Sequence, residues 1–125
     1  MDKEQLLRYL DNKKTFGFNV LCKENNIAWV ILSKRFPVER FFERFQEIDN
    51  PELFAEQLKI KDQPYNVWVA EMTKATYNSD QVPASEDYLI NENYNFKTLG
   101  EVESFLATLN LDLANIKWSS EIKFF

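Results

Sequence analysis

The side chains that most often carry out chemistry near neutral pH are nearly missing from this chain of 125 residues. It contains no histidine and a single cysteine, Cys22. Acid/base catalysis by histidine, Ser-His-Asp and Cys-His nucleophile pairs, and zinc sites built from cysteine and histidine are therefore excluded. No base adjoins Cys22 in the sequence Val20-Leu21-Cys22, so we expect a small apolar side chain rather than a reactive thiol.

Carboxylates are the only abundant catalytic side chains that remain. Glu39 and Glu43 lie four residues apart on an expected helix and are one candidate pair for two-carboxylate hydrolysis. Arg40 and Arg44 alternate with them, a pattern that is more typical of a charged helix edge facing solvent. We therefore expect a binding protein rather than an enzyme, with no catalytic residue.

A second group of carboxylates could hold a hard cation. Glu86, Asp87 and Glu92 offer oxygen ligands of the kind that Ca²⁺ prefers. Their segment lacks the Asp-x-Asp-x-Asp-Gly spacing and the tight-turn glycine of a calcium loop. We therefore expect neither a metal nor another cofactor.

The charged residues are unevenly distributed. The net charge is −5; residues 1–62 contain 11 Lys/Arg and 11 Asp/Glu, whereas residues 63–125 contain 4 and 9. No Lys or Arg lies between Lys74 and Lys97. The candidate binding residues in and around this cation-free segment are Tyr77, Asp80, Glu86, Asp87, Tyr88, Glu92 and Tyr94. Because carboxylates repel phosphate backbones, we expect no nucleic acid to bind there.

One basic cluster favours the opposite interpretation. Lys34-Arg35, Arg40 and Arg44 are interleaved with phenylalanines, and basic groups beside aromatic rings can bind single-stranded nucleic acid. The simpler interpretation is that the rings belong to the core and the cations to its rim. The balanced charge of this half of the chain further weakens the nucleic-acid hypothesis.

Hydrophobic periodicity predicts alternating helical and extended segments. Leu6, Leu7 and Leu10 predict a helix over 2–12, and period-two alternation predicts a hairpin of strands over 16–22 and 27–32. Prolines at 37 and 51 predict the starts of two consecutive helices. Further along we expect a central strand over 65–72, a loop over 77–86, a short strand over 87–90 and a polar turn over 91–95. A helix should then begin with a Thr98–Glu101 capping box and close at Asn110. The last expected element is a strand over 118–125.

This order of elements predicts the fold class. We expect a single α+β domain over 1–125, with an antiparallel or mixed sheet of about four to five strands and helices packed mainly on one face. Strict strand–helix alternation fails at the first hairpin, which disfavours a doubly wound parallel sheet. Trp29, Trp68 and Trp118 fall in three different strands, where core packing is the dominant explanation.

The sequence also indicates a compartment. A single cysteine cannot form an internal disulfide, which favours a reducing environment. The charged first residues lack the apolar run of a signal peptide, and no apolar stretch approaches the ~20 residues that cross a bilayer. We therefore expect a cytoplasmic protein that does not contact membranes.

Together these observations favour a small acidic protein-binding module, most plausibly an inhibitor or immunity-type protein that neutralises a basic protein such as a nuclease toxin. Carboxylates would pair with cations of the partner, and tyrosines would supply rigid contact area. One alternative is a carboxylate-dependent enzyme or small-ligand-binding protein with an aromatic pocket. Another is a homo-oligomeric accessory subunit, such as a homodimer, that uses the edge of its terminal strand.

Overall fold

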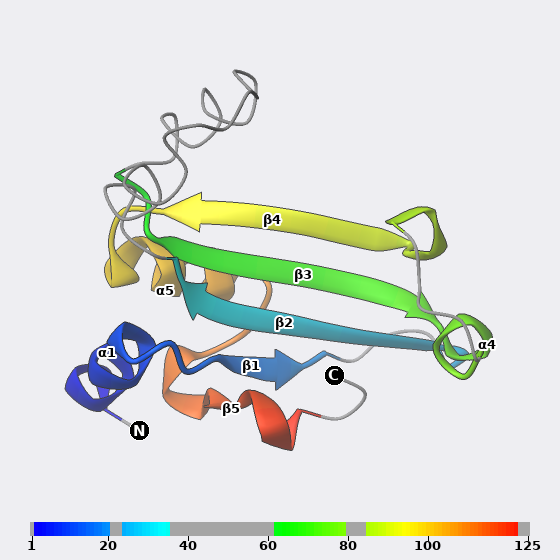
Figure 1. Ribbon diagram of the computed structural model, residues 1–125, viewed down its shortest axis with the longest axis horizontal. Coiled ribbons are helices and arrows are strands. Elements are labelled where there is room, and N and C mark those ends of the chain that lie inside the picture. Colours follow the sequence, from blue (N-terminus) through cyan, green and yellow to red (C-terminus); the bar gives the residue numbers. More distant parts are fainter. Residues whose placement is uncertain (1, 21–23, 36–61, 80–84, 123–125) are drawn as a thin grey trace, which may run out of the picture.

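A five-stranded antiparallel sheet in the order β4-β3-β2-β1-β5 forms the centre of the molecule (Figure 1). The structure is a computed structural model that describes residues 2–20, 24–35, 62–79 and 85–122. The strands are β1 (Phe16–Asn19), β2 (Asn26–Lys34), β3 (Tyr65–Thr73), β4 (Ile90–Phe96) and β5 (Lys117–Trp118). The helices are α1 (Lys3–Asp11), α4 (Lys74–Tyr77) and α5 (Leu99–Thr108), with 3₁₀ turns η1 (Ser85–Asp87), η2 (Leu113–Asn115) and η3 (Ser119–Glu121). The expected α+β class is confirmed, and the two helices predicted from the prolines at 37 and 51 lie outside the described residues.

The β1–β2 hairpin forms where the alternating pattern predicts it. Phe16 lies opposite Leu32 and Phe18 opposite Val30, so one face of the hairpin is continuously apolar. Between them, Gly17 passes so close to β2 that a Cβ at this position would lie 2.4 Å from the carbonyl oxygen of Val30. The hairpin therefore needs a residue without a side chain at Gly17.

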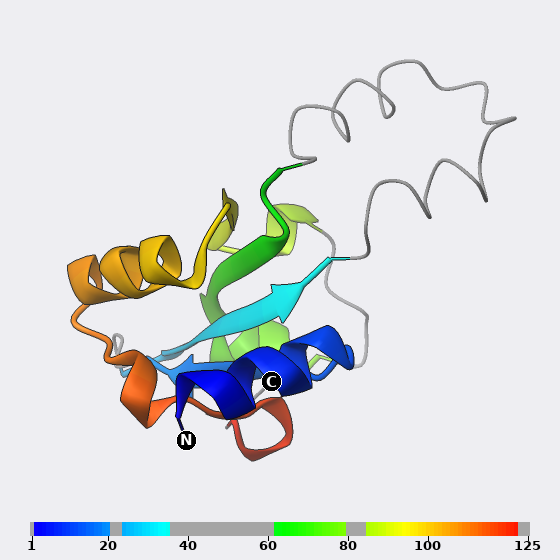
Figure 2. The same ribbon diagram turned by 90° about the vertical axis from the view of Figure 1, so that its left-hand side faces the viewer.

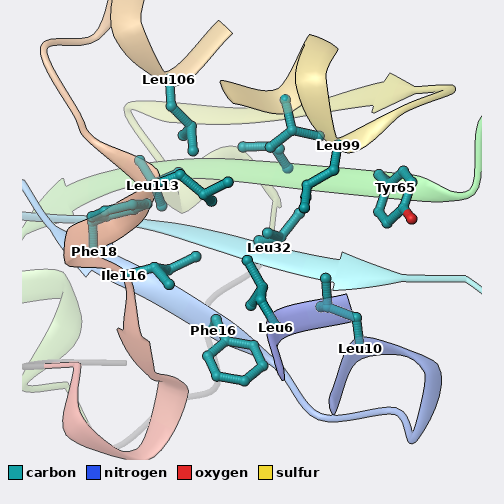
Figure 3. Close-up of a cluster of buried hydrophobic side chains, with 13 residues drawn as sticks. Leu6, Leu10, Phe16, Phe18, Leu32, Tyr65, Leu99, Leu106, Leu113 and Ile116 are labelled. Carbon is teal, nitrogen blue, oxygen red and sulfur yellow. The ribbon is translucent and has the colours of Figure 1, made fainter. Parts of the chain in front are cut away.

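One face of the sheet carries α1 and α5, and its buried side chains form the larger core (Figure 3). We call it the helix-covered face. Helix α1 packs near β2, and α5 packs against β3 and β4 (Figure 2). The core residues that the helices contribute are Leu6, Leu10, Leu99, Val102 and Leu106, and those that the strands contribute include Phe16, Phe18, Val30, Leu32, Tyr65 and Val67.

The opposite face has a smaller apolar cluster. Its strand residues are Ile27, Trp29, Ile31, Ala70 and Met72. Ile122, which follows η3, is 5% exposed and packs into the same cluster. Trp68 and Tyr88 lie partly buried at its rim. This face is thus covered by chain segments rather than by α1 or α5.

Both long helices begin with the side-chain caps that their sequences predict. The Asp2 carboxylate accepts a hydrogen bond from the backbone N–H of Gln5 at 2.8 Å. The Thr98 hydroxyl accepts one from the N–H of Glu101 at 3.2 Å, and the Glu101 carboxylate reaches back to the N–H of Lys97 at 3.4 Å. These bonds satisfy donors that the first helical turn leaves without backbone partners. Asn110 follows α5 with a φ of 60°, as expected for a residue that closes a helix.

The polar turn that we expected over 91–95 is wrong, because β4 runs through it. Asparagine favours turns through local backbone bonds, and three asparagines in five residues produced that expectation. In the sheet, Asn91, Asn93 and Asn95 occupy one face of β4 while Ile90 and its period-two neighbours occupy the other. Hydrogen bonding to β3 over the whole length of β4 outweighs the local preference. The short strand expected over 87–90 likewise begins only at Ile90.

The terminal strand expected over 118–125 is also wrong for most of its described length. Strand β5 ends at Trp118 after pairing with Phe16 and Gly17, and η3 follows it. Trp118 packs against the helix-covered core, whereas Ile122 belongs to the opposite cluster. The turn therefore carries the chain around the edge of the sheet, which a continuous strand with Trp118 and Ile122 on one face cannot do.

Candidate functional site

Carboxylates and exposed apolar side chains gather at one end of the sheet. Helix α4 follows β3 at that end, and η1 lies just before β4, so both lie at the end of the sheet remote from α1 (Figure 1). The residues that form this surface are Glu71, Tyr77, Glu86, Asp87, Leu89, Ile90 and Glu92. We call it the acidic end.

The strand register places two carboxylates around an exposed isoleucine. Ile90 lies directly opposite Glu71, and Glu92 is the next residue of β4 on the same face. Ile90 is 41% exposed, Glu92 is exposed and Glu71 is half-buried. Neighbours of this kind on one face of an antiparallel pair lie within about 5–8 Å of one another. An apolar contact point flanked by negative charge is thus built into the β3–β4 ladder.

The segment before β4 is held on the sheet by two contacts. The backbone N–H of Leu89 donates to the carbonyl of Glu71 at 2.8 Å. The ring of Tyr88 meets that of Trp68 edge-on, with 6.1 Å between centroids, on the face opposite to Ile90. The side chain of Leu89 is left 57% exposed. These contacts fix where Glu86 and Asp87, in η1 immediately before them, stand relative to the sheet.

The structure brings some of the sequence-predicted site residues together and separates others. Tyr77 (38% exposed, at the end of α4) and the exposed pair Glu86 and Asp87 lie at the acidic end with Glu92. Tyr94 lies further along β4, where its ring packs on Phe105 of α5 with 4.6 Å between centroids. Tyr88 belongs to the opposite face. Asp80 lies outside the described residues.

Sequence reasoning missed three members of the acidic end. Glu71 was hidden inside a strand expected to be central, and Leu89 and Ile90 inside a short strand. A period-two pattern over Ile90, Glu92, Tyr94 and Phe96 was the available signal. The intervening asparagines hide this pattern, because they resemble a turn.

The acidic end contains one cation of its own, in the first turn of α4. Between residues 63 and 96 the sequence contains one cation, Lys74. Two ion pairs elsewhere in the described chain join Lys3 to Glu103 at 2.8 Å and Lys34 to Asp11. Neither pair involves the acidic end, where Glu71, Glu86, Asp87 and Glu92 outnumber the single lysine and leave a net negative charge.

Two cations of the expected basic cluster, Lys34 and Arg35, contact other segments of the fold. The Lys34 ammonium, besides its ion pair, lies 5.7 Å from the centre of the Tyr65 ring. The Arg35 guanidinium donates to the carbonyl of Gln63, and burial lowers its pKa from the ordinary value. Both side chains thus tie the end of β2 to neighbouring segments. Arg40 and Arg44 lie outside the described residues.

The surface of the described chain is also hollowed away from the acidic end. One hollow of about 600 Å³ lies beside α5 and is lined by residues that include Phe96, Thr98, Ser104 and Phe105. A smaller one of about 200 Å³ lies between the start of α1 and η2. Within the described ranges, no three carboxylate or cysteine side chains gather into a metal-binding group. None of the helices described here is long and apolar enough to cross a membrane.

Comparison with known proteins gives no further assignment: no family model, no curated protein and no solved structure matches this chain. The geometry of the acidic end is therefore what indicates a function.

Proposed function

We propose that this chain is a small protein-binding module that recognises a basic protein through its acidic end, in the manner of an inhibitor or immunity protein. The observation that carries the proposal is the placement of Glu71 and Glu92 around the exposed Ile90, beside the exposed pair Glu86 and Asp87. Such a surface combines long-range attraction with an apolar point of contact.

The two parts of the surface act at different stages of binding. The carboxylates speed the encounter with a positively charged partner and align it, an effect that falls with ionic strength. Leu89 and Ile90 then gain free energy as they leave water, at about 25 cal/mol for each Å² of apolar area buried. Contiguous exposed apolar groups rimmed by polar residues mark protein contact sites, and Leu89 and Ile90 are consecutive exposed side chains flanked by carboxylates.

The open geometry favours partner binding over an aromatic catalytic pocket. Glu86 and Glu92 are exposed. The ring nearest in sequence to Glu86, Tyr88, packs on Trp68 rather than around a carboxylate. A carboxylate that serves as a catalytic acid is ordinarily enclosed by apolar groups. An exposed acidic surface of this kind suits a partner cleft rich in lysine and arginine.

Charge reversal at the acidic end tests the proposal. The chain is first used to capture its partner from host lysate at low salt, and the purified partner is then titrated against Glu86→Lys/Asp87→Lys. We expect the dissociation constant to rise roughly 100-fold, because two attractive contacts become repulsive. The salt dependence of binding should weaken in parallel.

The matched control reverses two exposed carboxylates far from the site, Glu4 in α1 and Glu121 in η3. Glu4→Lys/Glu121→Lys changes the net charge by the same amount and should alter binding only slightly. A captured partner that is not basic would contradict the proposal. An equal loss of binding in both double variants would do so as well, because it would show dependence on net charge alone.

A further inference from the structure

The outer edge of β4 is long and open. Among the described strands, β4 pairs with β3 on one side and with no strand on the other (Figure 1). It has seven residues, of which Ile90 to Tyr94 are exposed. An open edge presents a row of backbone donors and acceptors to another chain. Lysine, proline and bulges, which commonly block such an edge, do not interrupt the Ile90–Phe96 run.

Two backbone hydrogen bonds show which residues of β3 direct their N–H and C=O groups toward β2. The N–H of Arg35 donates to the carbonyl of Pro64, and the N–H of Lys74 to the carbonyl of Asn25, each at 2.8 Å. Both bonds continue the β2–β3 register, so even-numbered residues of β3 bond to β2. Since bonding alternates along an antiparallel strand, odd-numbered residues of β3 bond to β4.

The same alternation identifies the groups on the free edge. The β4 partners of the odd-numbered β3 residues are the even-numbered residues from Ile90 to Phe96. The backbone N–H and C=O groups of Asn91, Asn93 and Asn95 therefore point away from β3. These three residues are the ones that can hydrogen-bond to an added strand.

We propose that β4 pairs with β4 of a second copy of this chain, antiparallel and centred on Asn93, so that the two five-stranded sheets become one continuous sheet. Asn93 lies opposite Asn93 of the other copy, and Asn91 lies opposite Asn95. All three outward-facing asparagines then exchange backbone hydrogen bonds. The inference does not depend on the proposed function, but both use Ile90 and Glu92, so a second copy on β4 competes with a basic partner for these residues.

Charge selects this register over its neighbours. Only shifts by an even number of residues keep outward-facing groups opposite each other. A shift that centres the pair on Glu92 sets two carboxylates directly opposite, which destabilises an antiparallel pair, and uses fewer outward-facing residues. A shift that centres it on Tyr94 also leaves Asn91 without a partner in β4. Centring on Asn93 places Glu92 opposite Tyr94 instead.

The side chains on both faces suit a second copy. On one face, asparagine meets asparagine across the junction, and two of them are already oriented within the chain. The Trp68 indole N–H donates to the Asn91 side chain at 2.7 Å, and the Asn66 amide donates to that of Asn95 at 3.1 Å. On the other face, the exposed Ile90 comes opposite Phe96, which is half-buried. This pairing covers apolar area that water contacts in the single chain.

The first test measures the mass of the full chain in solution by light scattering during gel filtration, over a wide range of concentration and without any partner. We expect twice the mass of one chain at high concentration. Asn93→Pro removes an outward-facing N–H without removing a bond to β3, and should weaken the dimer roughly tenfold or more. The control Asn93→Thr keeps the N–H and should still dimerise. Circular dichroism checks that both variants fold.

The second test reads the register directly and does not require a proline. In a Cys22→Ser background, Asn93→Cys places two thiols across the junction at a Cα separation of about 5.5 Å, which a disulfide can span. Mild oxidation should yield a covalent dimer. The control Asn91→Cys places its thiols about 13 Å apart along the strands, too far for a disulfide.

Three results would overturn the inference. The chain could remain a single copy at every concentration, which shows that the edge does not pair. It could dimerise equally well as Asn93→Pro, which places the contact elsewhere. It could cross-link more readily through position 91 than through position 93, which excludes pairing centred on Asn93.

Discussion

The two edges of the sheet are built in opposite ways. Strand β5 pairs over only two residues, and its Trp118 lies 4.8 Å from the rings of both Phe16 and Tyr9. A hydrogen bond of 2.6 Å between the hydroxyls of Thr15 and Ser119 and the turn at η3 close this edge. Strand β4 is longer and exposed, and its outward-facing groups are all asparagine backbone. The first edge is completed within the chain, whereas the second is left for another molecule.

This difference separates the residues that stabilise the fold from those available for binding. On the β1–β5 side, aromatic rings pack against α1, and the backbone of Gly17 lies too close to Val30 to admit a side chain. Residues on this side therefore contribute mainly to the free energy of folding. On the β4 side, apolar groups remain in water. Substitutions should therefore affect mainly stability on the first side and mainly association on the second.

The largest expected effect is on the closed side. Phe16→Ala removes a fully buried ring that contacts Tyr9 and Trp118, and should lower the free energy of unfolding by about 3–5 kcal/mol. Tyr94→Ala, on the open side, removes a ring that is 39% exposed and should cost clearly less. Urea unfolding measures both values. Equal losses would remove the contrast between the edges.

A smaller loss is expected at the close approach of β1 to β2. Gly17→Ala forces a methyl group toward the backbone of Val30 and should cost about 1–3 kcal/mol. The matched control is Gly100 in α5, where a Cβ would meet only the Thr98 hydroxyl, at 3.8 Å. Gly100→Ala should stabilise the chain by about 0.5–1 kcal/mol, because alanine favours the helix. Thermal unfolding compares the two; if both variants stabilise, the close approach is not rigid.

The smallest effect on stability is expected at the acidic end. Ile90→Thr keeps a β-branched residue in the strand and should change the free energy of unfolding by no more than about 0.5 kcal/mol. The same change should weaken partner binding, because it removes most of an apolar contact point. Chemical unfolding and titration with the partner measure the two effects separately. A large loss of stability with unchanged binding would place Ile90 in the core instead.

Local signals predicted those elements whose pattern and tertiary environment agree. The stripe of Leu6 and Leu10, the alternation from Phe16 and the Thr98–Glu101 capping box each point to one structure, and the sheet and helices require the same structure. Prediction failed over 91–95 and after Trp118. In both places the decisive interaction comes from a distant segment: β3 for the first, and the edge formed by Thr15 and Phe16 for the second.

The sequence predicts where the negative charge of the candidate site lies, but not which of its side chains share a face of the sheet. The cation-free stretch after Lys74 is visible in the sequence and contains Glu86, Asp87 and Glu92. Which side chains share a face depends on the strand register. With β4 interpreted as a turn, Tyr88 and Glu92 could not be assigned to opposite faces, and the contribution of Glu71 from the neighbouring strand was not detectable.

The hydrogen bond from Trp68 to Asn91 gives the molecule an optical reporter of its own. The Trp68 indole lies between the buried Trp29, at 5.6 Å, and the open strand. Trp118, by contrast, lies at the opposite edge. Since indole emission follows the polarity around the ring, a molecule that settles against β4 should shift the fluorescence of Trp68 and leave that of Trp118 unaltered. Unlabelled protein can thus report which edge of its sheet is occupied.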